Sequence, residues 1–297
     1  MLDVSHIAVI VDLEQESHHA LMRAVDISKL FAAKITLVTS VYRNDINFTR
    51  LPVPGEETTP VEDSTDFYMQ QLMALANDIQ VDTDIEFKVV WHKNLYQGLL
   101  DYINDSDVDL VLKTAHKHST LEKLLTPTDW HLLRETEIPV LFVKQGRWPS
   151  QSNVIGAINI EADSAHQSLN RDIIESTVKL ADMCGGNPHL INVFPWPVID
   201  FGQLKHLIKR EDHFSKVSDT HKKLLMGYVK EHPIREEWIH QAEGLTPQEC
   251  IPDIISASRS DLLVIGTVRR NGLQGMTIGN TTEKILDDIR CEVLALK

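Results

Sequence analysis

The sequence predicts an α/β protein in which two doubly wound domains follow one another, each with a five-stranded, mainly parallel sheet and flanking helices. Short apolar runs of strand length alternate with longer stretches of helical apolar spacing, which is typical of βαβ units around a sheet buried on both faces. This alternation occurs twice along the 297 residues. A polar segment with Gly and Pro, 145–152, lies between the two copies, as expected of a domain boundary. We therefore expect one domain at 1–147 and a second at 148–297.

An internal repeat supports this division. Asp109-Leu-Val-Leu-Lys113 resembles Asp261-Leu-Leu-Val-Ile265, and the closing runs of the two halves also correspond. Right-handed crossovers between such strands give a Rossmann-like sheet, and apolar residues at helical spacing predict the first helix over 17–31. The expected strands are 6–12, 34–40, 84–91, 109–113 and 139–144 in the first half, and 153–159, 188–194, 235–242, 261–265 and 292–297 in the second.

Two long, weakly patterned stretches, 43–62 and 195–214, each follow the second strand of their half. Such loops can cover a site or contact a partner, although plain surface insertions are commoner. Both readings stay open at this point.

Composition limits the partners of the protein. A 42% apolar and 24% charged chain is typical of a globular protein with real cores. The formal net charge of −14 repels phosphate backbones and anionic lipid, so we expect neither nucleic acid nor a membrane as partner. A local basic patch can still bind a phosphorylated small molecule, because salt screens the diffuse field within about 8 Å.

The chain lacks the signs of export. Cys184, Cys250 and Cys291 lie far apart, with no CxxC spacing that would indicate a disulfide framework or a metal knuckle. The N-terminal apolar run is short and flanked by acids, unlike a signal peptide, and no run reaches the length of a membrane helix. These features predict a cytoplasmic protein.

A glycine-rich segment follows the fourth strand of the second half, at the edge where α/β sheets bind ligands. Glycines there let the backbone approach a phosphate, and amides at the start of the next helix, near Asn280, point toward the anion. Arg269 and Arg270 add positive charge. The alternative is a plain turn with Asn280 or Thr281 as N-cap.

The segment resembles the loop of tandem universal stress proteins of the E type, and the resemblance covers both halves. Nucleotide-binding members of that family carry Gly-x-x-Gly, nine residues, then Gly-Ser/Thr. The second half has Gly266-x-x-Arg269, nine residues, then Gly279-Asn280, so the spacing holds while two residue types depart. By this resemblance the second domain partly retains a nucleotide-binding loop, with ATP as the candidate ligand. The implied contacts are Asn159, Gly266, Arg269, Arg270, Gly279, Asn280 and Thr281.

The first half has lost the glycines of this loop. Its aligned stretch is Thr114-x-x-Lys117, nine residues, then Pro127-Thr128, and Pro127 removes an N–H that would have faced an anion. A degenerate loop therefore disfavours a triphosphate cradle here. For Asp12, which ends the first strand, a turn cap is the favoured reading over a ligand contact. The candidate pocket residues of this half are Asp12, Lys113, His116, His118 and Thr128.

No catalytic residue is predicted, since nucleophile-elbow, full P-loop and HExxH patterns are absent. His116 and His118 offer two imidazoles to zinc, and His92 ends the third strand nearby. No third or fourth ligand is visible in the sequence, so no metal site is predicted. Trp91 and Trp130 are read as core or interface aromatics.

The resemblance implies a stress-response protein that senses or carries a small ligand and is not a conventional enzyme. It also implies that the two halves pack as an internal pseudo-dimer through 140–143 and 293–296; a homodimer stays open. Two alternatives remain, an interaction scaffold with degenerate pockets and, ranking lower, a slow nucleotide hydrolase. Closed or protein-filled pockets would favour the scaffold.

Overall fold

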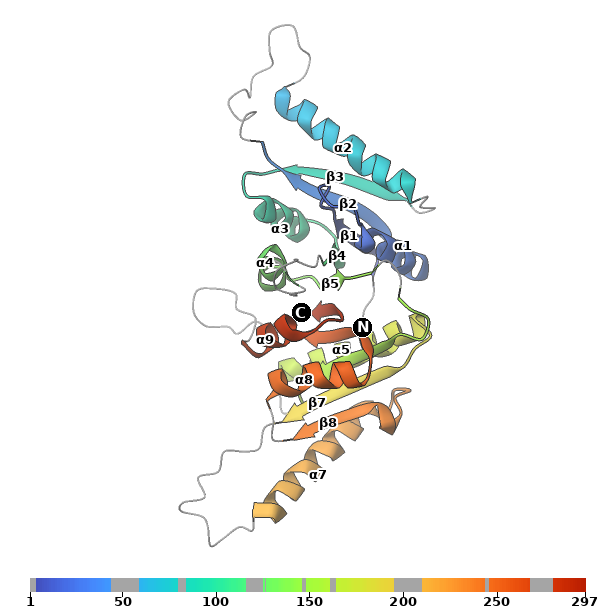
Figure 1. Cartoon of the computed structure of the whole chain (residues 1–297), viewed down its shortest axis with the longest axis vertical. Coiled ribbons are helices and arrows are strands. Elements are labelled where there is room, and N and C mark those ends of the chain that lie inside the picture. Colours follow the sequence, from blue (N-terminus) through green and yellow to red (C-terminus); the bar gives the residue numbers. More distant parts are fainter. Residues whose placement is uncertain are drawn as a thin grey trace. The chain divides into compact units, whose positions relative to one another are not determined.

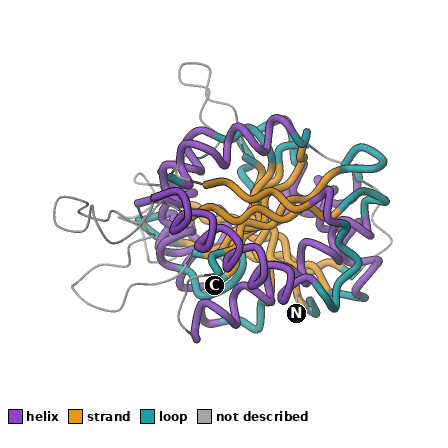
Figure 2. Tube along the Cα trace, turned by 90° about the horizontal axis from the view of Figure 1, so that it is seen from below, coloured by secondary structure: helices purple, strands orange, loops and turns teal. Residues whose placement is uncertain are grey.

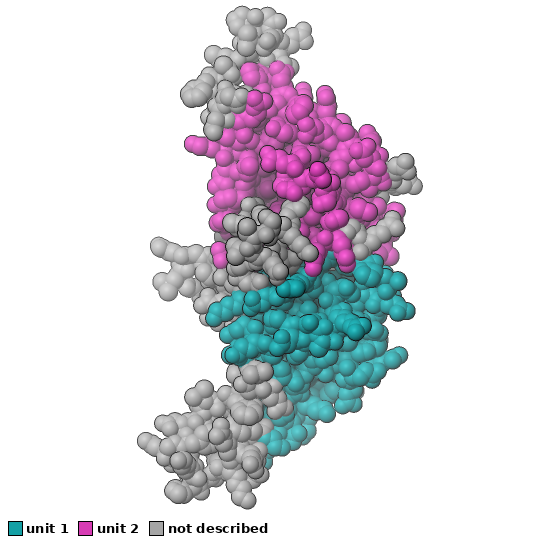
Figure 3. All heavy atoms as spheres, in the orientation of Figure 1, with its two compact units in different colours: residues 1–2, 148–297 teal, residues 3–147 magenta. Residues whose placement is uncertain are grey.

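The computed structural model describes residues 4–43, 59–79, 84–115, 125, 127–145, 148–160, 164–194, 210–243, 246–267 and 280–297. The chain divides into two compact units, one of residues 3–147 and one of residues 148–297 together with 1–2 (Figure 3). We call them the first-half unit and the second-half unit. Each is an α/β unit with strands inside and helices outside (Figures 1 and 2).

The strands of the first-half unit are parallel and lie in the order β3-β2-β1-β4-β5. Ile7 in β1 faces Ile35 of β2 on one side and Leu110 of β4 on the other. The order reverses direction between β1 and β4, which makes this the topological switch point. The elements are β1 (His6–Ile10), α1 (His19–Phe31), β2 (Lys34–Val41), α2 (Pro60–Asp78), β3 (Ile85–Trp91), α3 (Leu95–Asp105), β4 (Leu110–Thr114), α4 (Pro127–Glu135) and β5 (Val140–Val143).

The second-half unit repeats this plan in the order β10-β9-β6-β7-β8, again with parallel pairing. Its switch point lies between β6 and β9. The predicted fold class is therefore confirmed for both units. The elements are β6 (Asn153–Ile158), α5 (Ser164–Met183), β7 (Pro188–Phe194), α7 (Arg210–Val229), the 3₁₀ turn Glu236–Trp238, β8 (Ile239–Glu243), α8 (Pro247–Ala257), β9 (Ser260–Gly266), α9 (Asn280–Asp288) and β10 (Glu292–Leu296).

Most predicted boundaries differ from the structure by one or two residues, and three differ by more, each for a local reason. The stretch 43–62 ends at Thr59, because Thr59 and Glu62 form a capping box and Pro60 occupies the first helical turn of α2. The strand predicted at 235–242 begins only at Ile239, since the residues before it form the 3₁₀ turn. Residues 210–214, expected in a loop, begin α7, and 195–209 lie outside the described residues.

Two histidines pair inside the second-half sheet. His189 Nδ1 in β7 lies 3.0 Å from His240 Nε2 in β8, and the two rings stack with centroids 5.3 Å apart. Burial, and then the neighbouring His240, lowers the pKa of His189 to about 4. Burial also lowers the pKa of His240. Both rings are thus neutral near pH 7 in the folded unit.

This pair predicts an acid-sensitive second-half unit. Between about pH 6.5 and 4 the unfolded chain binds a proton at His189 that the folded chain does not, so stability falls as the pH drops through this window. We expect His189→Leu to reduce that fall by on the order of 1 kcal/mol. Urea unfolding at pH 7 and pH 5 measures it. An equal fall in both proteins would contradict the assignment.

Candidate functional site

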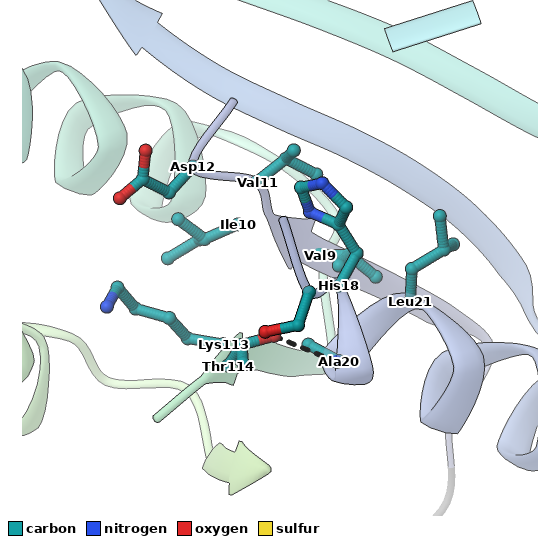
Figure 4. A pocket seen from close by; sticks show the side chains of 10 residues that line it. Val9, Ile10, Val11, Asp12, His18, Ala20, Leu21, Lys113 and Thr114 are labelled. Atoms are coloured by element: carbon teal, nitrogen blue, oxygen red, sulfur yellow. Dashed lines mark hydrogen bonds between the residues drawn. The ribbon is translucent and has the colours of Figure 1, made fainter. Parts of the chain in front are cut away.

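The first-half switch point contains a small pocket where β1 and β4 end beside the start of α1 (Figure 4). Figure 4 shows Asp12, Ile10 and Lys113 along one side of it and His18 with Leu21 along the other. Its volume is about 10 Å³, which is room for about one water molecule and not for a nucleotide. The lining residues are Val9, Ile10, Val11, Asp12, Ser17, His18, Ala20, Leu21, Lys113 and Thr114.

The start of α1 is held by the end of β4. Ala20 N donates to Thr114 Oγ1 at 3.0 Å, so a side chain of the strand satisfies one of the free amides of the helix. Asp12 Oδ1 accepts from Glu14 N at 3.1 Å. That bond is the turn cap expected for Asp12. Burial lowers the pKa of His18, against an opposing effect of the Asp12 carboxylate.

Lys113 and Thr114 point to opposite faces of the sheet, because successive strand residues alternate. Thr114 meets α1, whereas Lys113 Nζ lies 2.7 Å from Asp129 Oδ1 in the first turn of α4. The Asp129 side chain is 0% exposed and the Lys113 side chain 11%. The structure thus fills this edge with a buried ion pair that the sequence analysis did not predict.

Of the five predicted first-half pocket residues, Asp12 and Lys113 line the same pocket. His116 and His118 lie outside the described residues, as does the side chain of Thr128, whose backbone belongs to α4. Within the described part of the chain, no group of three or more His, Cys, Asp or Glu is placed to hold a metal ion.

At the second-half switch point the end of β6 is braced from α5. Asn159, which follows β6, is exposed, and its N–H donates to Asn170 Oδ1 at 3.1 Å. Asn170 Nδ2 donates in return to Asn159 O at 2.7 Å. Asn170 is 3% exposed, so its amide is dedicated to fixing this strand end. The sequence analysis missed it because a polar residue inside a helix shows no sign of which strand it meets.

The bracing predicts a positioning role for Asn170. We expect Asn170→Ala to lower the free energy of unfolding by about 1–3 kcal/mol, since two backbone groups lose their partner. Asn170→Asp keeps the acceptor but places a buried carboxylate against Asn159 O, and should cost at least as much as the alanine variant at pH 7. Chemical denaturation of the three proteins measures the order. Equal stability of Asn170→Ala and the parent would contradict the role.

Gly266 has a packing role that the sequence analysis did not foresee. A Cβ on Gly266 would lie 2.5 Å from Leu169 Cδ2, and one on Gly156 in β6 would lie 2.5 Å from Thr177 Oγ1. Both glycines therefore let α5 lie close to the sheet. The helix predicted to begin near Asn280 is α9, which begins at that residue. Arg269, Arg270 and Gly279, and the side chains of Asn280 and Thr281, lie outside the described residues.

A larger groove of the first-half unit lies between β3 and α3 and shares no lining residue with the switch-point pocket. Its volume is about 300 Å³. Lys88 on the strand and Asp105 on the helix face it from opposite sides, but it is open to solvent. Charged contacts in such a place contribute little binding energy. The lining residues are Lys88, Val90, His92, Gly98, Asp101, Tyr102, Asp105 and Ser106.

The fold and these two edges define a protein of two repeated doubly wound α/β units, each with polar residues at its switch point. The model of the universal stress protein family matches residues 4–144 and 166–297. The chain belongs to this family. No helix among the described residues has the length and apolar character needed to span a membrane.

Relatives of full length support the assignment. Universal stress protein E of Escherichia coli (strain K12) is 30% identical over 296 residues, covering 97% of this chain and 92% of the relative. The protein of the same name from Photorhabdus laumondii is 30% identical over 302 residues, covering 100% and 96%. A functionally unknown protein from Pseudomonas aeruginosa PAO1 has a crystal structure that superposes with a TM-score of 0.77 at 25% identity, covering 99% of this chain and 92% of that one.

Proposed function

We propose that this chain is a stress-response sensor or regulator that binds a phosphorylated small ligand, with ATP as the candidate, in its second domain. The domains are 1–147 and 148–297, and the second carries the ligand. Asn159, Gly266, Arg269, Arg270, Gly279, Asn280 and Thr281 are the proposed contacts. No conventional catalysis is assigned to it, and its location is the cytoplasm.

One observation carries this proposal. The exposed Asn159 ends β6 at the switch point, β9 ends next to β6, and the chain from β9 resumes as α9 at Asn280. A segment with two arginines and three glycines therefore connects the carboxyl end of a central strand to the start of a helix. Helix N-termini in that position bind phosphates through amide donors and the helix dipole.

The first domain has a switch-point pocket that is too small for a nucleotide. Its pocket of about 10 Å³ and its buried Lys113–Asp129 pair leave no room for a nucleotide among the described residues. Filled pockets favour the scaffold alternative for this half. The slow-hydrolase alternative has less support, because magnesium at a phosphate site needs oxygen ligands such as a carboxylate, and segment 266–281 contains none.

Ligand-dependent thermal stabilisation tests the proposal, with ATP, ADP, AMP and inorganic phosphate on the parent and on Gly279→Asp. A ligand at 100 times its Kd adds about 2.7 kcal/mol, enough to raise the midpoint by several degrees. We expect a nucleotide-dependent rise that Gly279→Asp abolishes, because a carboxylate at the helix start repels the phosphates. No rise with any nucleotide would contradict nucleotide binding and favour the scaffold. Phosphate alone giving the full rise would show that the base is not recognised.

The arrangement of the two domains belongs to the same proposal. We expect an internal pseudo-dimer formed through the closing strands, 140–143 and 293–296, with a homodimer as a further state of assembly. Nucleic acid and membranes are not proposed as partners, given the net charge of −14.

A further inference from the structure

The two switch points differ at one pair of equivalent positions. Lys113 of β4 lies opposite Ile10 of β1, and Ile265 of β9 lies opposite Ala157 of β6, so Lys113 and Ile265 occupy the same place in the two sheets. In the loop alignment, where Pro127-Thr128 matches Gly279-Asn280, Asp129 of α4 corresponds to Thr281 of α9. A buried ion pair in the first half thus corresponds to an isoleucine and a threonine in the second.

The Asp129 carboxylate does in the first half what a bound anion would do. It lies in the first turn of α4, where the helix dipole favours negative charge, and it holds the only cation that lines the described pocket at 2.7 Å. Both interactions are those that helix starts and lysines make with phosphate groups. Its 0% exposure means that no solvent ion competes for them.

We infer that Asp129 is a built-in anion that determines specificity, closing the first-half switch point to phosphorylated ligands. Among the described residues that line this edge, an incoming phosphate would meet the carboxylates of Asp129 and Asp12 and the ammonium of Lys113. At the matching positions the second half has Ile265 and Thr281, so its sequence contains neither member of this ion pair. This inference concerns the first half, and it holds or fails whether or not the second half binds ATP.

The test is a gain of phosphate binding. In the full chain with Gly279→Asp as the common background, Asp129→Asn keeps the shape of the side chain and removes its charge. We expect inorganic phosphate, compared with chloride at matched ionic strength, to stabilise Asp129→Asn saturably and to bind at least tenfold more tightly than to the background protein, because Lys113 and the helix start regain an anion. Titration calorimetry and thermal unfolding give the two readouts.

Two control variants separate this from a purely structural role. Lys113→Met with Asp129→Asn removes the cation and should lose the gained phosphate binding. Lys113→Ile with Asp129→Thr introduces the residue types of the second half. Because this variant lacks the lysine, it should not gain phosphate binding. A folded Asp129→Asn protein with no gain over its background overturns the inference, as does phosphate binding of equal strength in the background protein.

A folding defect would also be informative. If Asp129→Asn is unfolded in chloride, phosphate should restore its folding, because a ligand that binds only the folded chain stabilises it. Failure to fold in both salts would overturn the inference, since it would mean that the carboxylate has a purely structural role that phosphate cannot take over.

Discussion

Lys113→Met is expected to destabilise the first-half unit by about 3–5 kcal/mol, because it removes the cation paired with a buried carboxylate. Asp129 is 0% exposed, so water cannot replace the lysine without opening the unit. Urea unfolding at pH 7 followed by circular dichroism measures the loss.

The matched control for this prediction is Lys113→Ile combined with Asp129→Thr. Replacing both members of a buried ion pair is often near neutral, because the desolvation cost of the two charges disappears with them. We expect the double variant to lose well under half of what Lys113→Met loses. An equal or larger loss in the double variant would mean that packing, and not the charge of Asp129 left without Lys113, sets the cost.

Gly186→Ala is expected to cost at least about 3 kcal/mol, since the added methyl group has no space. A Cβ at Gly186 would lie 1.8 Å from the carbonyl oxygen of Ser152 and 2.5 Å from its carbon. Both atoms belong to the backbone just before β6, so the turn after α5 and the start of the strand would have to separate. The thermal midpoint of the second-half unit measures the effect.

The adjacent glycine provides the control. Gly185 has φ +61°, and a Cβ there would meet no atom within 4 Å. Gly185→Ala should therefore cost only about 1–2 kcal/mol, which is the price of a left-handed backbone with a side chain. Equal stability of the two alanine variants would contradict the close contact between Gly186 and the backbone of Ser152.

The strands were predictable because both sheets are buried on two faces. Runs such as 140–143 and 262–265 are continuously apolar, and the structure has strands at Val140–Val143 and Ser260–Gly266. The end of the fourth strand also identified the region of the switch point, because strand order follows from right-handed crossovers. The apolar pattern shows which residues are buried, and this information was sufficient to predict the fold class.

Pairings between distant side chains were not predictable. Lys113 was expected to line a pocket, but its partner Asp129 comes from a helix whose rotation the apolar pattern does not fix. The sequence also gives no sign that Asn170 contacts Asn159, since only the folded unit brings the two residues together. The role of Gly266 was also not predictable. A glycine that makes room for a ligand cannot be distinguished by sequence from one that makes room for a side chain such as Leu169.

Hydrogen exchange with and without ATP tests the central claim, that ligand binding belongs to the second half alone. The account predicts ATP-dependent slowing of amide exchange in peptides that cover 158–160 and the start of α9, with no change in peptides that cover 10–20 and 110–115. The Gly279→Asp protein should show no slowing in either half. Slowing in the first-half peptides, or none anywhere at saturating ATP, would contradict the division of roles between the two switch points.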